Sequence, residues 1–219
     1  MAITKVTFNT TASVETQQQE LYDFLTTYGS SYFDSIEKTT INELVTVECK
    51  INIGDNYAAL RFQYVNNYWR CGYVSDIHET TWNNTCDYKF KFGIATSKGI
   101  AIQYNDSIYN FSIVVISKTY EGNTFVYLPV SSGSYKTPKW VDMVTGANGG
   151  FSQFGAGSYL YYFTGETAST ALVPLITQNT FTYSPYVYQV CYTPQDGVIK
   201  KMKLQNIYFY TNGCVALMD

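Results

Sequence analysis

The sequence predicts a mainly β fold: an antiparallel sandwich or a jelly-roll-like or barrel domain, preceded by one N-terminal strand and one amphipathic helix. Three observations favour this fold class. From Leu44 onward, apolar residues alternate with polar ones at period two. Turn residues separate these stretches at short intervals. Only the stretch that follows Ser13 has the helical period. Many short strands joined by regular turns are typical of sandwiches and barrels.

Residues 1–43 are expected to form a strand and a helix that pack on the main domain. Residues 3–8 alternate well enough for a strand. Ser13 is a good N-cap for the helix, because its hydroxyl can accept from a backbone N–H of the first turn. The helix is expected to end after Gly29 and before Ser35. Its apolar face has helical spacing and consists of Val14, Leu21, Phe24, Leu25 and Tyr28.

Residues 44–53 carry the strongest strand signal in the chain. Apolar side chains alternate there with polar ones, which predicts one buried face and one solvated face. Residues 57–65 and 68–74 continue the pattern after short turns, so an antiparallel meander is expected. The polar stretch 75–87 is expected to be a loop.

The remainder of residues 44–219 is expected to complete one antiparallel β domain. The glycine-rich stretch 131–158 is expected to be a long loop with a short strand at 140–144. No linker and no fixed repeat interrupts the chain, so it is expected to form one structural unit. The other strands are expected at residues 88–94, 100–104, 108–117, 125–130, 159–163, 171–176, 186–192, 199–204, 207–210 and 214–217.

The composition excludes several kinds of partner. Charged residues make up 14% of the chain, against roughly 25% in an average soluble domain. The net charge of −3 offers no basic excess for phosphates or anionic lipids, so nucleic-acid and membrane-surface binding are not expected. No signal peptide is recognisable, and no apolar run is long enough to span a membrane. The 22 tyrosines predict a surface suited to contact, because tyrosine combines an apolar ring with a polar tip.

No metal or cofactor site is expected. The five cysteines are widely spaced and form no CxxC pair, and His78 is the only histidine. Cys49 lies on the apolar side of an alternating strand, so it is expected to be a small buried hydrophobe. The cysteines are therefore expected to be reduced and structural.

No catalytic motif stands out, and the protein is expected not to be an enzyme. His78 lacks the second histidine of a zinc-protease helix and an identifiable nucleophile, so it is expected to be a solvated loop residue. The glycine-rich stretch 146–157 lacks the lysine of a phosphate-binding loop. Glycosidase chemistry remains an alternative, because its carboxylates can be distant in sequence.

Aromatic residues are the only candidate binding residues. Together with amide and carboxylate side chains, exposed aromatic rings could form a platform for a carbohydrate or a partner protein. Core packing or a subunit interface uses the same residues and is the favoured interpretation. The candidate aromatic residues are Trp69, Trp82, Trp140, Tyr159 and Tyr161.

Two stretches resemble a family of small β-rich virion structural proteins of tailed phages and prophages of gut Firmicutes, of the clostridial type. The first is TKVTFNTTASV at residues 4–14, followed by LYDFL at 21–25 and YFD at 32–34. The second is TALVP at residues 170–174, with the ending TNGCVALMD at 211–219. Together they touch about half of the chain, and they carry no catalytic residues.

The resemblance implies a structural component of a phage virion, in the tail, baseplate or fibre region. It implies synthesis in the cytoplasm of the bacterial host, and partners among copies of itself, with a trimer as the expected oligomer, and other virion proteins. A carbohydrate- or receptor-binding module that recognises a host cell-surface glycan is the first alternative. A glycan-degrading hydrolase is the second.

Overall fold

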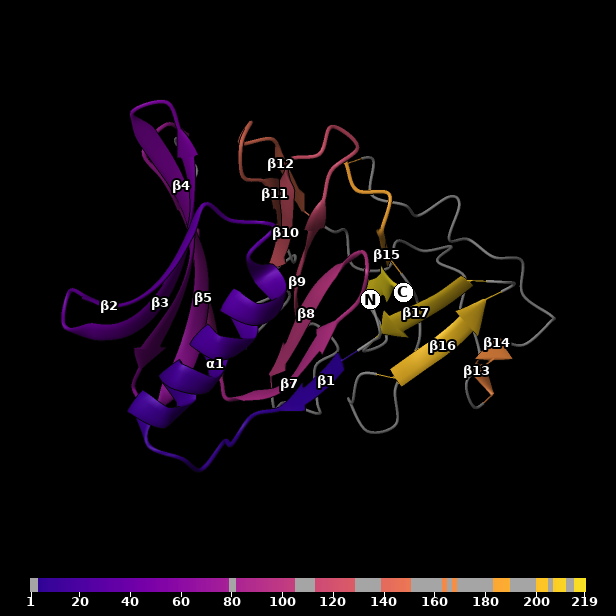
Figure 1. Ribbon diagram of the computed structural model, residues 1–219, viewed down its shortest axis with the longest axis horizontal. Helices are drawn as coiled ribbons and strands as arrows, with labels where there is room; N and C mark the ends of the chain where they lie inside the picture. The colour runs from indigo at the N-terminus through magenta and orange to yellow at the C-terminus, as the bar shows by residue number, and fades with distance from the viewer. Residues whose placement is uncertain are drawn as a thin grey trace.

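Three β-sheets and one helix make up the described structure (Figure 1). The computed structural model describes residues 4–78, 82–104, 113–128, 139–150, 163–164, 167–168, 183–189, 200–204, 207–211 and 215–219. The expected fold class is confirmed: the protein is mainly β, and among the residues just given its strand pairs are antiparallel apart from one, with sheets that stack as in a sandwich and do not close into a barrel. The exception is β14 with β16, which pair in parallel.

The first sheet is a meander of five strands in chain order. Two-residue turns in which both residues have positive φ close its first and third hairpins, at Asn42-Glu43 and at Asn66-Asn67. Such turns match the right-handed twist of the strands that they join. The strands are β2 (Ser35–Ile41), β3 (Leu44–Ile53), β4 (Asn56–Val65), β5 (Tyr68–Ser75) and β6 (Trp82–Tyr88).

Two strands of this sheet correct the sequence-based expectations. β2 pairs with β3 along its whole length, so the boundary drawn after residue 43 falls inside a hairpin. β6 occupies part of the stretch 75–87 that was expected to be a loop, and it pairs with β5. Both segments are polar and lack clear alternation. Their partner strands stabilise them, and sequence pattern alone does not show this.

The middle sheet contains the N-terminal strand beside strands from the centre of the chain. The glycine-rich stretch expected to be mostly loop supplies its last two strands. The order across the sheet is β1 (Thr4–Thr7), β7 (Phe90–Ala95), β8 (Gly99–Tyr104), β9 (Ile113–Lys118), β10 (Thr124–Leu128), β11 (Lys139–Asp142) and β12 (Asn148–Gly150).

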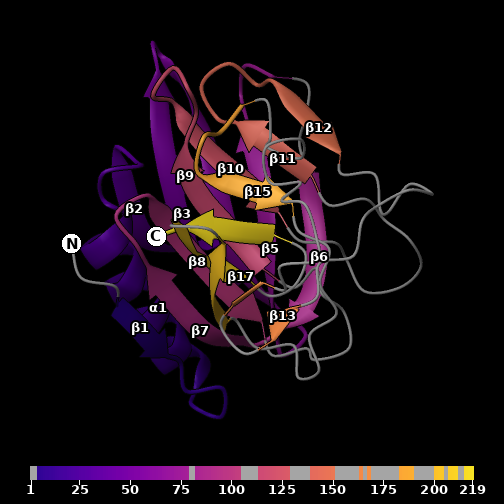
Figure 2. The ribbon, with the colours of Figure 1, turned by 90° about the vertical axis from the view of Figure 1, so that its right-hand side faces the viewer.

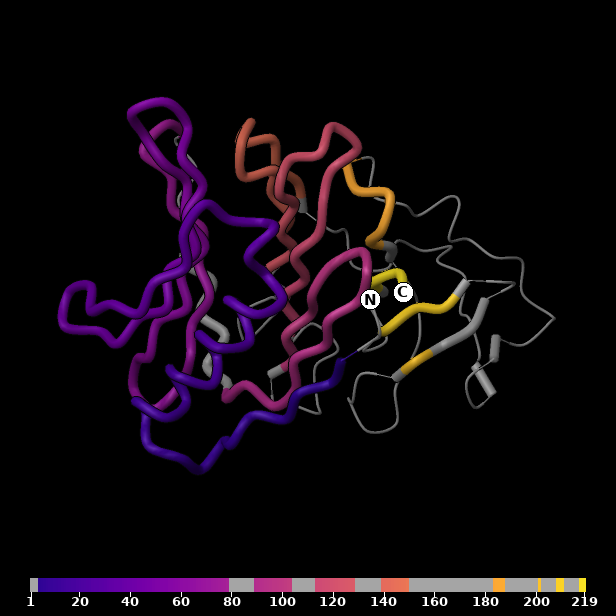
Figure 3. The backbone as a smooth tube through the Cα atoms, viewed as in Figure 1, coloured from indigo at the N-terminus to yellow at the C-terminus, as the bar shows by residue number. Residues whose placement is uncertain are grey.

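The third sheet is built from the C-terminal part of the chain (Figure 3). The expected strands near residues 199–204, 207–210 and 214–217 are confirmed, whereas residues 171–176 lie outside the described residues. The order is β13 (Phe163–Thr164), β14 (Thr167–Ala168), β16 (Lys200–Leu204), β17 (Ile207–Thr211), β18 (Val215–Met218) and β15 (Val187–Gln189).

The middle sheet lies between the other two sheets (Figure 2), and its central strands contribute side chains to a core on each face. On β9, Val114 and Ile116 join the core shared with the first sheet, whereas Ile113 and Val115 join the core shared with the third sheet. Successive side chains of a strand point to opposite faces, so a strand between two layers must be apolar on both. The stacking therefore gives three layers of sheet with two cores between them.

Helix α1 (Val14–Gly29) fills the space between the first and middle sheets (Figure 1). The predicted cap is confirmed: the Thr16 N–H donates to Ser13 Oγ at 3.3 Å. The helix buries the predicted residues Leu21, Phe24 and Leu25. Across from it, a Cβ on Gly93 of β7 would lie 2.6 Å from the Phe24 ring, so this glycine lets helix and sheet approach closely.

Candidate functional site

Trp69 is a core residue and forms no part of a surface platform. It is 0% exposed and lies 5.3 Å from Phe90 and 5.4 Å from Tyr64, measured between ring centroids. Its indole Nε1 donates to the side-chain oxygen of buried Gln17 at 3.1 Å. A buried indole N–H needs such a partner, and α1 supplies it. This tryptophan therefore joins the helix to the first sheet.

Trp140 is half-buried, so part of its ring lies at the surface. It stacks on Phe125 of the second core at 5.9 Å, and the ring of Tyr183 lies 4.6 Å from it. Trp82 begins β6 at the register position opposite Tyr73. Tyr159 and Tyr161 lie outside the described residues. The described structure therefore does not bring the predicted set together.

His78 is half-buried and joins two segments, so the expectation of a solvated loop histidine is wrong. Its Nε2 lies 3.2 Å from the carbonyl oxygen of Val144, and its backbone N–H donates to Ser75 Oγ at 3.1 Å. The imidazole packs directly over Gly146. It connects the segment after β5 to the turn between β11 and β12, which is a structural role.

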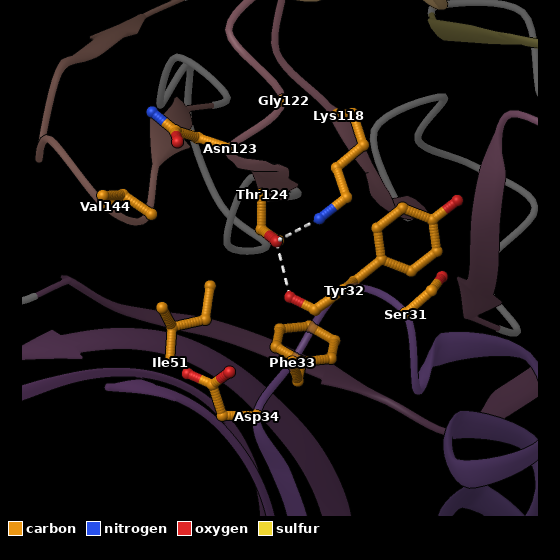
Figure 4. A pocket seen from close by; sticks show the side chains of 10 residues that line it. All are labelled: Ser31, Tyr32, Phe33, Asp34, Ile51, Lys118, Gly122, Asn123, Thr124 and Val144. Atoms are coloured by element: carbon orange, nitrogen blue, oxygen red, sulfur yellow. Dashed lines mark hydrogen bonds between the residues drawn. The ribbon is translucent and has the colours of Figure 1, made fainter. Parts of the chain in front are cut away.

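A pocket of about 190 Å³ lies where the first and middle sheets meet (Figure 4). Four segments form it: the connection between α1 and β2, the strand β3 through Ile51, the turn between β9 and β10 with the strand ends beside it, and Val144 after β11. The turn closes through a hydrogen bond from the Gly122 N–H to the Thr119 carbonyl at 3.1 Å. The lining residues are Ser31, Tyr32, Phe33, Asp34, Ile51, Lys118, Gly122, Asn123, Thr124 and Val144.

Lys118 supplies the positive charge of this pocket. Its Nζ donates to Thr124 Oγ1 at 3.4 Å and lies 5.3 Å from the centre of the Tyr32 ring. The Thr124 hydroxyl donates in turn to the Tyr32 carbonyl at 2.5 Å, which fixes its orientation. Among the described residues, no carboxylate lies within ion-pair distance of Lys118. Burial lowers the pKa of this lysine, and the charge of Asp34 opposes that shift only in part.

Asn123 and Asp34 add hydrogen-bond acceptors to the lining of the pocket. The Asn123 Nδ2 donates to buried Asp142 at 3.1 Å, which leaves its Oδ1 as the atom that can accept. Asp142 also accepts from the backbone N–H groups of Val144 and Thr145. Asp34 accepts from the Asn52 N–H at 2.6 Å through Oδ2. In Figure 4 the carboxylate of Asp34 and the amine of Lys118 lie on opposite sides of the pocket.

An aromatic surface lies beside the pocket. It consists of Tyr120 from the turn between β9 and β10, Tyr183 and Trp140, and we call it the turn surface. Tyr120 is 66% exposed, the most exposed large hydrophobic side chain in the described part of the chain. Its backbone N–H donates to the Tyr183 carbonyl at 3.0 Å. Tyr183 is 37% exposed and rests on the Trp140 ring. The rings of Trp140 and Tyr183 are thus held by stacking, and Tyr120 beside them is largely exposed to solvent.

The outer face of the first sheet carries a network of charges. Glu48 is almost fully buried on this face, where it pairs with Arg61 and, at 2.9 Å, with Lys50. No other layer of the described structure covers this face. A second pocket, of about 240 Å³, lies beside the network and is lined by Asn42, Leu44, Arg61, Gln63, Val65, Arg70, Cys71 and Gly72.

Sequence reasoning did not find the pocket. Lys118 and Tyr32 are 86 positions apart in the sequence and come together only when the sheets stack. Among the described residues, no group of three or more histidine, cysteine or acidic side chains is placed to hold a metal ion. The helix in the described part of the chain is too short and too polar to cross a membrane.

Comparison with known proteins finds no family model, no curated protein and no solved structure that matches this chain.

Proposed function

We propose that this protein is a non-enzymatic structural component that works by assembly, in the tail, baseplate or fibre region of a tailed-phage virion. The observation that carries the proposal is the nature of the exposed apolar surface. Four of the five exposed large hydrophobic residues in the described chain are tyrosines: Tyr68, Tyr120, Tyr183 and Tyr208, with Ile77 as the fifth. Tyrosine is enriched, and charged residues are depleted, at the centres of protein interfaces.

The turn surface is the contact that fits this role best. Its base is rigid, because Trp140 stacks on Phe125 in the core between the middle and third sheets. Rings that are ordered before binding lose little conformational entropy when a partner covers them. The stacked sheets act as a scaffold that presents Tyr120 to another copy of the chain.

Light scattering on the purified chain at micromolar concentration tests the proposal. We expect a stable oligomer, with a trimer as the expected mass. Replacing Tyr120 and Tyr183 together by serine should shift the mass toward the monomer, because it removes both exposed rings of the turn surface. Tyr68→Ser is the matched control, since Tyr68 is also exposed but begins β5 in the first sheet.

A wild-type chain that stays monomeric at these concentrations would contradict assembly. An oligomer that the double variant leaves intact would contradict the role given to the turn surface. Tail or baseplate genes on either side of the gene would support the virion assignment, and their absence would weigh against it.

A second candidate function is the binding of a host glycan, and the pocket beside Lys118 favours it. An aromatic ring, a cation and amide and carboxylate acceptors surround that pocket. This pocket differs from the aromatic platform expected from the sequence, because its aromatic ring is that of Tyr32 and not that of a tryptophan. A glycan array separates this candidate from pure assembly: the second candidate predicts selective signals that Lys118→Met abolishes.

A further inference from the structure

The pocket around Lys118 holds a charge that the described part of the protein does not neutralise. The amine is half-buried, and its partners there are one hydroxyl and one aromatic ring. Partial burial of a cation without a carboxylate partner costs stability. The lowered pKa of Lys118 has the same cause. A buried cation that lowers the stability of the fold in this way is typical of a binding site, where a ligand supplies the missing negative charge.

On the side of the pocket opposite Lys118, Asp34 offers hydrogen-bond acceptors, so a ligand that fills the pocket needs hydrogen-bond donors there. Asp34 accepts one backbone hydrogen bond through Oδ2, and its carboxylate has further acceptor capacity. The Oδ1 of Asn123 can also accept, because Nδ2 is the atom bonded to Asp142. A second carboxylate on the ligand would be repelled by Asp34, whereas hydroxyl groups would be satisfied there.

We propose that this pocket binds a small monocarboxylate that carries several hydroxyl groups, such as a sugar acid, with its carboxylate beside Lys118 and its hydroxyls on Asp34 and Asn123. The carboxylate forms an ion pair with the amine, and the ring of Tyr32 packs against the apolar part of the ligand. No bond is made or broken.

The size of the pocket limits the ligand to one sugar unit. Pockets that take drug-sized molecules measure roughly 300–1,000 Å³, whereas this one measures about 190 Å³. Affinity is expected to be modest, with a Kd of about 1 mM, because few polar groups and one ring contribute. The sugar acid can be free in solution or can be one unit of an acidic polysaccharide.

This inference makes the second candidate function specific and rests on that candidate. It does not depend on assembly. Light scattering tests assembly and titration tests the pocket, so either can fail alone.

Titration of the full-length chain with three probes tests the inference, with binding followed by NMR chemical shifts or calorimetry. Glucuronate carries both the charge and the hydroxyls, glucose only the hydroxyls, and acetate only the charge. We expect glucuronate to bind at least tenfold more tightly than either of the others. An oligosaccharide of glucuronate distinguishes the two sources: tighter binding than the free sugar indicates a polysaccharide unit, and equal or weaker binding indicates the free acid.

Lys118→Met is the decisive variant. It should weaken glucuronate binding at least tenfold and leave glucose unchanged, and it should raise the melting temperature by about 2 °C, because it removes an uncompensated charge. Lys118→Arg should restore much of the binding. Lys98→Met is the matched control, since Lys98 lies 5.2 Å from the Tyr186 ring but does not line the pocket, so binding should not change.

Three results would overturn the inference. Absence of glucuronate binding up to 20-fold above the expected Kd, about 20 mM, would refute the sugar-acid site, whereas the glycan array decides the second candidate separately. Equal binding of glucose or acetate would leave a pocket but refute the ligand class. Unchanged glucuronate binding in Lys118→Met would place the ligand elsewhere on the molecule.

Discussion

At the scale of single residues, the imidazole of His78 packs against the backbone of Gly146. Gly146 adopts a φ of 73°, a conformation that side chains with a Cβ rarely adopt. A Cβ at this position would also lie 2.5 Å from Nδ1 of His78. The position of the ring of His78, the only histidine of the chain, therefore requires a glycine at position 146.

Gly146→Ala should lower the free energy of unfolding by about 3 kcal/mol, because backbone strain and a steric clash combine. Urea denaturation measures this loss. Gly122→Ala is the matched control: its φ is 88°, but no atom lies within 4 Å of the added Cβ. The control should lose about 1 kcal/mol from strain alone. Equal losses in the two variants would show that the contact with His78 contributes nothing.

At the scale of elements, the packing of α1 on the middle sheet depends on Gly93. The Phe24 ring occupies the space where a side chain of β7 would stand. Phe24 also makes an edge contact with Phe8, whose ring centroid lies 5.6 Å away. The helix is thus fixed between the sheets through one ring and one glycine.

Gly93→Ala should lower the free energy of unfolding by about 2 kcal/mol, because the helix or the ring must shift. Phe24→Leu in the same chain should recover part of the loss, since a smaller side chain frees the space. Denaturation of the two single variants and the double variant gives the coupling between the positions. Strict additivity of the two losses would mean that ring and glycine do not meet in solution.

The sequence predicted the elements that have a strong local pattern and missed those without one. The strand Leu44–Ile53 has the bounds expected from its alternation, and α1 begins at the expected cap. The strands Ser35–Ile41 and Trp82–Tyr88 were missed, because both are mostly polar and owe their conformation to neighbouring strands.

The candidate site was hidden from the sequence for a related reason. Its residues lie in turns and near the ends of strands, carry no local signal, and come together only where two sheets meet. Aromatic residues, in contrast, are candidate binding residues in any sequence, whether their rings lie in the core or at the surface of the folded protein. Trp69 shows that composition does not distinguish a core ring from a surface ring.

At the scale of the whole molecule, buried ionisable groups predict alkaline unfolding. Burial raises the pKa of the Cys49 thiol above its ordinary value of 9.0 and that of the Tyr32 phenol above 10.0. The pKa of Lys50 is raised above 10.5, chiefly by its hydrogen bond to Glu48. Each group releases its proton more readily in the unfolded chain than in the folded protein. Lys118, whose pKa is lowered, opposes the trend.

The folded state therefore holds more protons than the unfolded state at high pH, and stability must fall as pH rises. We expect a nearly constant midpoint of urea unfolding around neutral pH and a progressive fall that begins near pH 9, where the unfolded thiol titrates. Cys49→Ala should delay the start of the fall. A midpoint that rises between pH 9 and pH 11 would contradict the predicted direction.

In the proposed assembly, a rigid scaffold of stacked sheets presents the turn surface to another copy of the chain. Hydrogen exchange, followed by mass spectrometry at low and high protein concentration, measures which surface that second copy covers. Peptides from within the strands β8, β9 and β10 should be protected at both concentrations, and those that contain Tyr120 or Tyr183 should gain protection only at the higher one. Protection that does not depend on concentration, or that appears at the hairpin of β4 and β5 instead, would contradict the claim.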